Sequence, residues 1–442
     1  MLRRDAIHAL GAALLAPRLP LCRRPASAAD WNAWRIDGPR INRWLSELSR
    51  FGRNADGGVS RVGFTDADIE GRGYTMERMR AAGLEVEVDP AGNILGRRAG
   101  TAPGLRPIII GSHVDSVLHG GNYDGDVGSL GAVEVALTLA ERGYRNRHPL
   151  WVAVWCDEES GLTGSRGFIG QVSAEQLAAP YREGRTLAEC IARIGGDPAR
   201  MPSYRTGPGS VAAYVELHIE QGGNLDRDGQ DIAVVEGIVG IRSWNVAIDG
   251  FANHAGTTPM AERKNALLAA AELILAVDAI VKAEPGRQVG TVGRLSVEPG
   301  AQNVVPGRVL HSIELRDLEM AKLERLWSRI RAEGDRIMER HGTTWEHVEK
   351  AVNTGARSST GVRSAIGEAA DGLGLSRVPL PSMAGHDAQS LAAIAPMGMI
   401  FVPSVGGISH SPKEYTTPED VTNGVNVLLQ TTLRLDQAGA TD

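Results

Sequence analysis

The sequence has few of the residues on which several common chemistries depend. Its 442 residues include only three cysteines, at positions 22, 156 and 190, and they form neither a Cys-x-x-Cys pair nor a zinc-finger spacing. Any bound metal must therefore use imidazole and carboxylate ligands. A thiol nucleophile is also disfavoured, because the acidic residues that follow Cys156 raise the pKa of its thiol.

Other absences narrow the class of protein further. No run approaches the roughly 20 apolar residues that a membrane-spanning helix requires. The formal net charge of −6 gives no electrostatic reason to expect a nucleic acid partner. Gly-x-Ser-x-Gly, Walker and His-Glu-x-x-His motifs are missing, which argues against the enzymes built on them. The balance of 42% hydrophobic and 23% charged residues predicts a globular protein with a sizeable core.

The N-terminus differs in composition from the rest of the chain. Arg3 and Arg4 precede a modestly apolar run at residues 6–16, and residues 25–29 offer a small-residue cleavage site. This pattern resembles a twin-arginine export signal over residues 1–29. We therefore expect a periplasmic protein that folds before export. The alternative is a basic tail on a cytoplasmic protein.

Strand-like and helical runs alternate over residues 30–240, and the pattern returns over residues 352–442. Buried strands are predicted at 108–111, 151–155, 211–217 and 399–402, and a helix at 129–141. This alternation predicts an α/β fold with a doubly wound, mostly parallel sheet. Sites in such sheets lie beyond the carboxyl ends of the strands.

Residues 241–351 follow a different order of elements. Strands are predicted at 242–249, 291–297, 308–315 and 343–349, and helices at 261–281 and 318–340. The order β-α-β-β-α-β is that of a ferredoxin-like, split βαβ module. We therefore predict an inserted lid or dimerisation domain within a larger catalytic domain.

Candidate chemistry begins where the first buried strand ends. His113 and Asp115 are two positions apart, so in an extended chain one can bind a metal while the other orients it. Asp124 follows in a glycine-rich loop, and its two carboxylate oxygens could bridge two metals. The alternative for Asp124 and Gly125 is a plain turn.

Three further segments follow predicted strands. In 157–159, Asp-Glu-Glu, neighbouring side chains diverge, which favours one ligand and one general base over a shared site. His218 and His410 end or follow two other strands and are candidate ligands. The alternatives are a solvated acidic loop, a satisfied core histidine and an ordinary surface loop.

Together these segments resemble the dinuclear metal amidohydrolases of the aminoacylase–carboxypeptidase superfamily. The resemblance is strongest to the branch of N-carbamoyl-L-amino-acid hydrolases, β-ureidopropionases and allantoate amidohydrolases. It extends over nearly the whole chain after the N-terminus and rests on the ordered motifs GSHVDSV, GGNYDGDVG, DEE, ELHIEQG, FANHAGTTPM, AQNVVPG, ELRD, AGHDA and SHSPKE.

The resemblance implies a role for each matching residue. Two divalent cations per subunit, with zinc expected first and manganese, nickel or cobalt as alternatives, would be held by His113, Asp124, Glu159, His218 and His410. Glu158 would be the general base, and Asp115 would orient His113. His254 would cross a homodimer interface to stabilise the oxyanion. Substrate contacts would come from Gln221, His254, Asn303 and Arg316.

The resemblance also implies hydrolysis of the carbamoyl C–N bond of an N-carbamoyl-L-amino acid or a related ureido acid, a carboxylated small molecule. A metallo-aminoacylase or peptidase acting on N-acyl amino acids, and a non-catalytic exported carboxylate-binding protein, remain alternatives. The segment 160–166 is shorter than its family counterpart, and Met383 and Gln389 also depart from the family pattern. These departures predict a different pocket shape and a different substrate tail.

Overall fold

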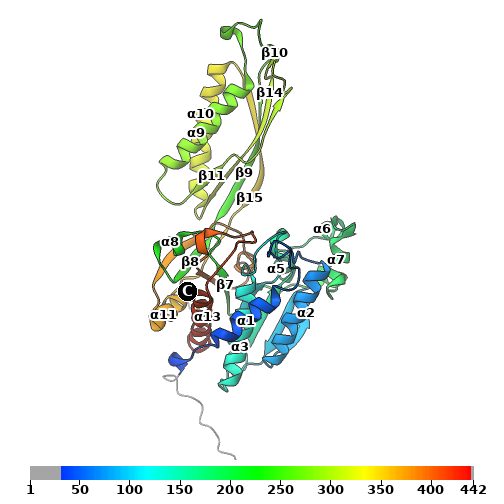
Figure 1. The fold of residues 1–442 in the computed structure, drawn as a ribbon, viewed down its shortest axis with the longest axis vertical. Helices are drawn as coiled ribbons and strands as arrows, with labels where there is room; N and C mark the ends of the chain where they lie inside the picture. The colour runs from blue at the N-terminus through cyan, green and yellow to red at the C-terminus, as the bar shows by residue number, and fades with distance from the viewer. Residues whose placement is uncertain (1–30, 440–442) are drawn as a thin grey trace, which may run out of the picture.

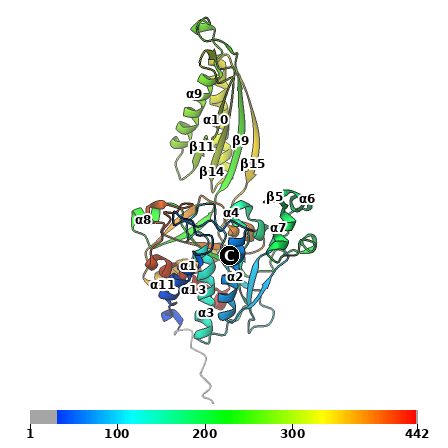
Figure 2. The same ribbon diagram turned by 45° about the vertical axis from the view of Figure 1, so that its right-hand side comes forward.

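The computed structural model describes residues 31–439, which form a lower and an upper lobe (Figures 1 and 2). The expected export signal at residues 1–29, with Arg3 and Arg4, lies outside the described residues, so export stays a prediction. Within the described part of the chain, no helix has the length and apolarity needed to cross a bilayer.

The lower lobe is built on a nine-stranded mixed sheet. Its strands are, in spatial order, β1 (Glu85–Val88), β2 (Ile94–Arg98), β4 (Leu150–Trp155), β3 (Ile108–His113), β7 (Ala213–Ile219), β18 (Met397–Val402), β8 (Ile232–Ile238) and β16 (Ala356–Arg357), with β17 (Arg377–Ser382) also paired to β8. The central strands β4, β3, β7 and β18 are parallel, and antiparallel pairs flank them. This confirms the predicted α/β fold.

Helices cover both faces of this sheet, which explains why its central strands are apolar on both sides. One face packs against α1 (Gly38–Leu48), α3 (Asp126–Glu141), α11 (Thr360–Leu373) and α13 (Pro418–Ala438). The other packs against α5 (Thr163–Phe168) and α12 (Asp387–Leu391) through Phe168 and Leu391. Shorter or peripheral elements are α2 (Asp66–Ala81), α4 (Glu158–Gly161), α6 (Ala174–Ala178), β5 (Pro180–Arg182), β6 (Arg185–Thr186), α7 (Leu187–Arg193) and α8 (Asn224–Asp228).

The upper lobe contains a separate antiparallel sheet of five strands. They are β11 (Val289–Thr291), β14 (Arg308–Asp317), β9 (Gly240–Asp249) and β15 (Thr344–Asn353), with β12 (Leu295–Glu298) also paired to β14. Helices α9 (Ala266–Ala283) and α10 (Met320–His341) pack on one face around Trp244, Leu273 and Leu326. A small ribbon of β10 (Asn253–His254) and β13 (Val304–Val305) lies at the end farthest from the lower lobe (Figure 1).

Two details of the upper lobe differ from the sequence prediction. Helix α9 begins at Ala266 rather than at residue 261, because the Asn265 side chain caps it by accepting the N–H groups of Leu267 and Leu268. The strand predicted at 291–297 is split into β11 and β12, with Gly293 in the break. Glycine weakens a strand because it has no side chain to pack, so the split is physically reasonable.

Candidate metal centre

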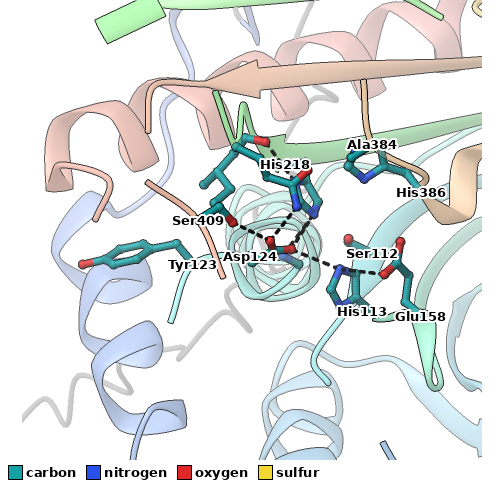
Figure 3. A network of polar contacts seen from close by, with 12 residues as sticks. Ser112, His113, Tyr123, Asp124, Glu158, His218, Ala384, His386 and Ser409 are labelled. Atoms are coloured by element: carbon teal, nitrogen blue, oxygen red, sulfur yellow. Dashed lines mark hydrogen bonds and ion pairs between the residues drawn. The ribbon is translucent and has the colours of Figure 1, made fainter. Parts of the chain in front are cut away.

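The candidate site lies where the four parallel strands of the lower lobe end. Strand β3 ends at His113, and β4 leads into α4, which begins with Glu158 and Glu159. His218 is near the end of β7, and His410 lies in the loop after β18. Because these strands are parallel and adjacent, their carboxyl ends meet at one edge of the sheet (Figure 3).

Asp124 is the centre of this group. Its Oδ1 atom lies 3.0 Å from Nε2 of His218 and 3.5 Å from Nε2 of His113. Its Oδ2 atom lies 3.4 Å from Nε2 of His410, which is also 3.4 Å from Oε2 of Glu159. The structure thus brings together all five predicted ligands. They form two three-residue groups that could each hold a cation and that share Asp124.

Backbone carbonyls orient the two buried histidines. The Nδ1 atom of His113 lies 2.9 Å from the carbonyl oxygen of Asp115, and Nδ1 of His218 lies 2.9 Å from that of Ile219. A carbonyl can only accept, so each Nδ1 carries the hydrogen and each Nε2 keeps its lone pair. The Nε2 lone pair of His113 has no hydrogen-bond partner among the described residues, whereas that of His218 accepts the Gly125 N–H at 3.2 Å, a hydrogen bond that a cation beside Asp124 would replace.

Asp115 orients His113, as expected, but not through its carboxylate. Its carboxylate oxygen is 3.8 Å from Nδ1 of His113, so the carbonyl rather than the carboxylate orients that ring. The carboxylate instead accepts the backbone N–H groups of Glu158, at 3.1 Å, and Glu159, at 3.2 Å. Asp115 therefore fixes both the histidine and the start of α4.

Asp124 is itself held by residues to which the sequence analysis assigns no such role. The Ser409 hydroxyl donates to Oδ2 of Asp124 at 2.9 Å, and Glu414 accepts the Asp124 backbone N–H at 3.0 Å. Gln221, predicted as a substrate contact, donates to the same Oδ2 at 2.7 Å. Ser409 and Glu414 belong to the motif SHSPKE, so this motif is the feature of the sequence from which their place in the site could have been predicted.

Steric constraints explain why the residue after Asp124 is a glycine. Gly125 has φ of +67°, and a Cβ atom there would lie 2.4 Å from the His113 ring. Glycine alone accepts this backbone conformation without strain and leaves the ring its space. The Asp-Gly pair is therefore a turn, as the alternative interpretation held, but a turn that presses against a candidate ligand.

Burial and crowded charges perturb the pKa values of the site. Burial raises the pKa of Glu158 well above its ordinary value, against the opposing effect of His113. Burial and the charge of Asp124 raise the pKa of Glu159 to about 7. A hydrogen bond with Asp124 raises the pKa of His410 to about 9. Crowded carboxylates of this kind are relieved by a cation placed among them.

The residues fit a pair of divalent cations. Nε2 of His113 and Oε1 of Glu159 are buried, and neither has a hydrogen-bond partner among the described residues. The donor set consists of imidazole nitrogens and carboxylate oxygens, which suits zinc, manganese, nickel and cobalt. Glu158 belongs to neither ligand group, although its Oε2 atom lies 3.8 Å from Nε2 of His113.

A cavity of about 310 Å³ opens onto these residues. Its wall includes Ala384, Gly385 and His386, three residues of the motif AGHDA, for which the sequence analysis gives no role. The His386 ring packs edge-on against His218, with ring centroids 4.5 Å apart (Figure 3). Its Nε2 atom lies 2.8 Å from the Ser382 hydroxyl, so His386 supports a candidate ligand from behind.

Two of the three predicted residues of the upper lobe, His254 and Asn303, lie far from the metal centre within one chain. His254 and Asn303 are exposed neighbours at the far end of the upper lobe, where the Ala255 N–H donates to the Asn303 carbonyl at 2.9 Å (Figure 1). Arg316 is near the opposite end of that lobe and donates to the Met383 carbonyl of the lower lobe at 2.8 Å. Within one chain, Asn303 and Arg316 are therefore apart.

Comparison with known proteins agrees with this geometry. Residues 109–434 match Peptidase family M20/M25/M40. An N-carbamoyl-L-amino acid amidohydrolase of Geobacillus stearothermophilus is 40% identical over 91% of this chain and 99% of its own. An allantoate amidohydrolase of Bacillus subtilis is 35% identical over 88% of this chain and 95% of its own length. The crystal structure of a putative amidohydrolase/peptidase from Burkholderia cenocepacia, 36% identical, superposes with a TM-score of 0.84 over 91% of this chain and 99% of that one. The chain belongs to the M20/M25/M40 peptidase family, as one of its amidohydrolases.

Proposed function

We propose that the protein hydrolyses the carbamoyl C–N bond of an N-carbamoyl-L-amino acid or a related ureido acid. The observation that carries this proposal is a buried carboxylate, Glu158, that lies beside two ligand groups sharing Asp124 but belongs to neither. This is the arrangement that metal-assisted hydrolysis of an amide requires. The relative from G. stearothermophilus, named for its action on N-carbamoyl-L-amino acids, supports the choice of substrate.

Glu158 is suited to move the proton in this reaction. Two divalent cations held by the five ligands would supply Lewis-acid activation of a water molecule and of the scissile carbonyl. The Glu158 carboxylate takes a proton from the attacking water and delivers it to the leaving nitrogen. Its raised pKa, caused by burial, lets it hold that proton between the two steps. The products are the amino acid, carbon dioxide and ammonia.

Arg316 is suited to bind the substrate carboxylate. Its guanidinium can form two parallel hydrogen bonds with a carboxylate, which fixes the orientation of the substrate. In this structure the side chain is half-buried, its Nε atom donates to Glu314 at 2.8 Å, and its Nη1 atom donates to the Met383 carbonyl, next to Ala384 and Gly385 of the cavity wall. The carboxylate end of the substrate would therefore lie between the two lobes.

We further propose a homodimer in which His254 and Asn303 complete the site of the partner subunit. Two features of the upper lobe support this assembly. Helix α9 exposes Leu268 and Leu275, seven residues apart on one face, and their exposed fractions are 53% and 71%. Strand β15 forms an unpaired sheet edge and exposes Val348. A second copy of the chain would cover these apolar side chains.

The proposed pair of cations predicts a specific change in metal content. Replacing His410 by alanine should reduce bound metal from two ions per chain to one, because His410 belongs to only one of the two ligand groups. Elemental analysis of purified protein measures this directly, with zinc as the first metal expected. His119→Ala is the control, because His119 is an exposed histidine paired with Asp56 outside both groups. Equal metal content in the two variants would contradict the assignment.

The substrate class is tested by the products released. Ammonia release from a panel of N-carbamoyl-L-amino acids and allantoate is compared with amine release from the matching N-acyl compounds. The proposal expects turnover of the carbamoyl or ureido substrates. Turnover of N-acyl substrates alone would identify an aminoacylase or peptidase. A protein without metal and without turnover would be the non-catalytic binding protein instead.

A further inference from the structure

A second, larger cavity adjoins the metal centre and has no role in the reaction described above. This groove, of about 820 Å³, lies between the segment 161–171 and α12 on one side and the segment 352–357 on the other. The segment 352–357 runs from the end of β15 into β16 and connects the two lobes. We call this cavity the arginine groove, because Arg166 and Arg357 are in its wall.

The charge of the arginine groove has one sign. No carboxylate is among the described residues that line it, and its other polar side chains include Gln171, Asn353 and Gln389. Arg166 donates to the carbonyl oxygens of Gly161, at 3.5 Å, and Gln171, at 3.1 Å. Within residues 31–439, neither arginine has a carboxylate within ion-pair distance. Two arginines in the wall of one cavity, neither of them paired with a carboxylate, favour an anionic ligand.

The arginine groove also adjoins the catalytic cavity. Gly161 and Leu162 line both cavities, so the short segment after Glu159 is the wall between them. Leu162 has a left-handed backbone with φ of +57°, which is uncommon for a residue with a branched side chain. This is the segment that is shorter than its family counterpart. Gln389, one of the two other departures, is in the same groove and donates to Asn353.

By contrast, the charged cavity at the base of the upper lobe is compensated by its own residues. There Lys322 pairs with Asp317 at 2.9 Å, and Arg287 lies 3.7 Å from Glu236. Lys322 and Arg287 of this cavity therefore have neighbouring carboxylates. Arg357 lines this cavity as well as the arginine groove, and the arginine groove differs because no carboxylate is among the described residues that line it.

We propose that the arginine groove binds a second negatively charged group of the substrate, so that the enzyme prefers N-carbamoyl amino acids with an acidic side chain. This inference rests on the proposed function. The reacting group lies at the metal centre, and a side chain that passes the Gly161–Leu162 wall reaches the groove. A carboxylate there forms an ion pair with Arg166 and Arg357, whereas an amide of the same shape can accept a hydrogen bond from them but has no negative charge to pair with theirs.

The test compares two substrates of nearly equal shape. We expect kcat/KM for N-carbamoyl-L-glutamate to exceed that for N-carbamoyl-L-glutamine by about 10- to 100-fold, as hydrogen bonds to charged groups typically contribute. In Arg166→Gln and in Arg357→Gln this ratio should fall toward one. The ratio cancels general damage to the site, because both substrates use the same metal centre. Arg145→Gln, an exposed arginine in the loop before β4, is the matched control and should keep the wild-type ratio.

The outcomes separate the two proposals. A wild-type ratio near one, with ammonia released from both substrates, overturns the inference and leaves the proposed function standing. A wild-type preference for glutamate that survives both groove substitutions also overturns it, because the carboxylate then binds elsewhere. If neither compound nor any other carbamoyl substrate releases ammonia, the proposed function and the inference fall together.

Discussion

Replacing Glu158 by glutamine is expected to lower kcat by about 10²- to 10⁴-fold, which is the usual contribution of a positioned general acid–base group. Glutamine keeps the shape of the side chain but cannot accept the proton. Metal content should stay at the wild-type value, because Glu158 belongs to neither ligand group. Steady-state kinetics combined with elemental analysis gives both quantities from one preparation.

The neighbouring residue provides a matched control. Glu159 is the next residue in α4, and its backbone N–H also donates to Asp115, so the two substitutions disturb the backbone similarly. Glu159→Gln should lose one metal ion, because Oε2 of Glu159 belongs to the group around His410. If Glu158→Gln loses metal while Glu159→Gln keeps it, the roles of the two carboxylates are exchanged and the proposed mechanism is wrong.

Much of the candidate site could be predicted from the sequence because it depends on strand ends. His113, His218 and the acidic segment 157–159 each follow an apolar run that forms a central strand. Parallel strands place such residues at one edge whatever the details of packing. The β-α-β-β-α-β order of the upper lobe was predictable for a similar reason, since local hydrophobic periodicity determines it.

Contacts across long stretches of chain could not be predicted in this way. Glu414 accepts the Asp124 N–H across 290 positions, and nothing near either residue indicates that pairing. The carbonyl, rather than the carboxylate, of Asp115 orients His113, and a sequence does not distinguish these two atoms. Gln221 contacts Asp124 because β7 and the loop before α3 end side by side, a consequence of sheet order that periodicity does not reveal.

Replacing His254 by alanine is expected to lower kcat by about 10²- to 10³-fold, the typical cost of removing one oxyanion donor. Metal content should not change, because His254 is exposed at the far end of the upper lobe and belongs to neither ligand group. A loss of metal in this variant would show that the residue has a different role. The variant alone, however, does not tell whether the histidine acts within its own chain or on a partner.

A mixture of two inactive variants makes that distinction. Chains carrying His254→Ala are unfolded and refolded, or co-expressed, with chains carrying Glu158→Gln. In a two-fold symmetric dimer that exchanges upper lobes, a mixed dimer has one site with Glu158 from one subunit and His254 from the other. Random mixing then restores about one quarter of wild-type activity, since half of the dimers are mixed and each has one intact site of two. If His254 served its own chain, every site would lack one of the two groups and mixing would restore nothing. Recovery therefore requires the exposed end of the upper lobe to reach the metal centre of another subunit, which is what the distance between them within one chain leads us to expect.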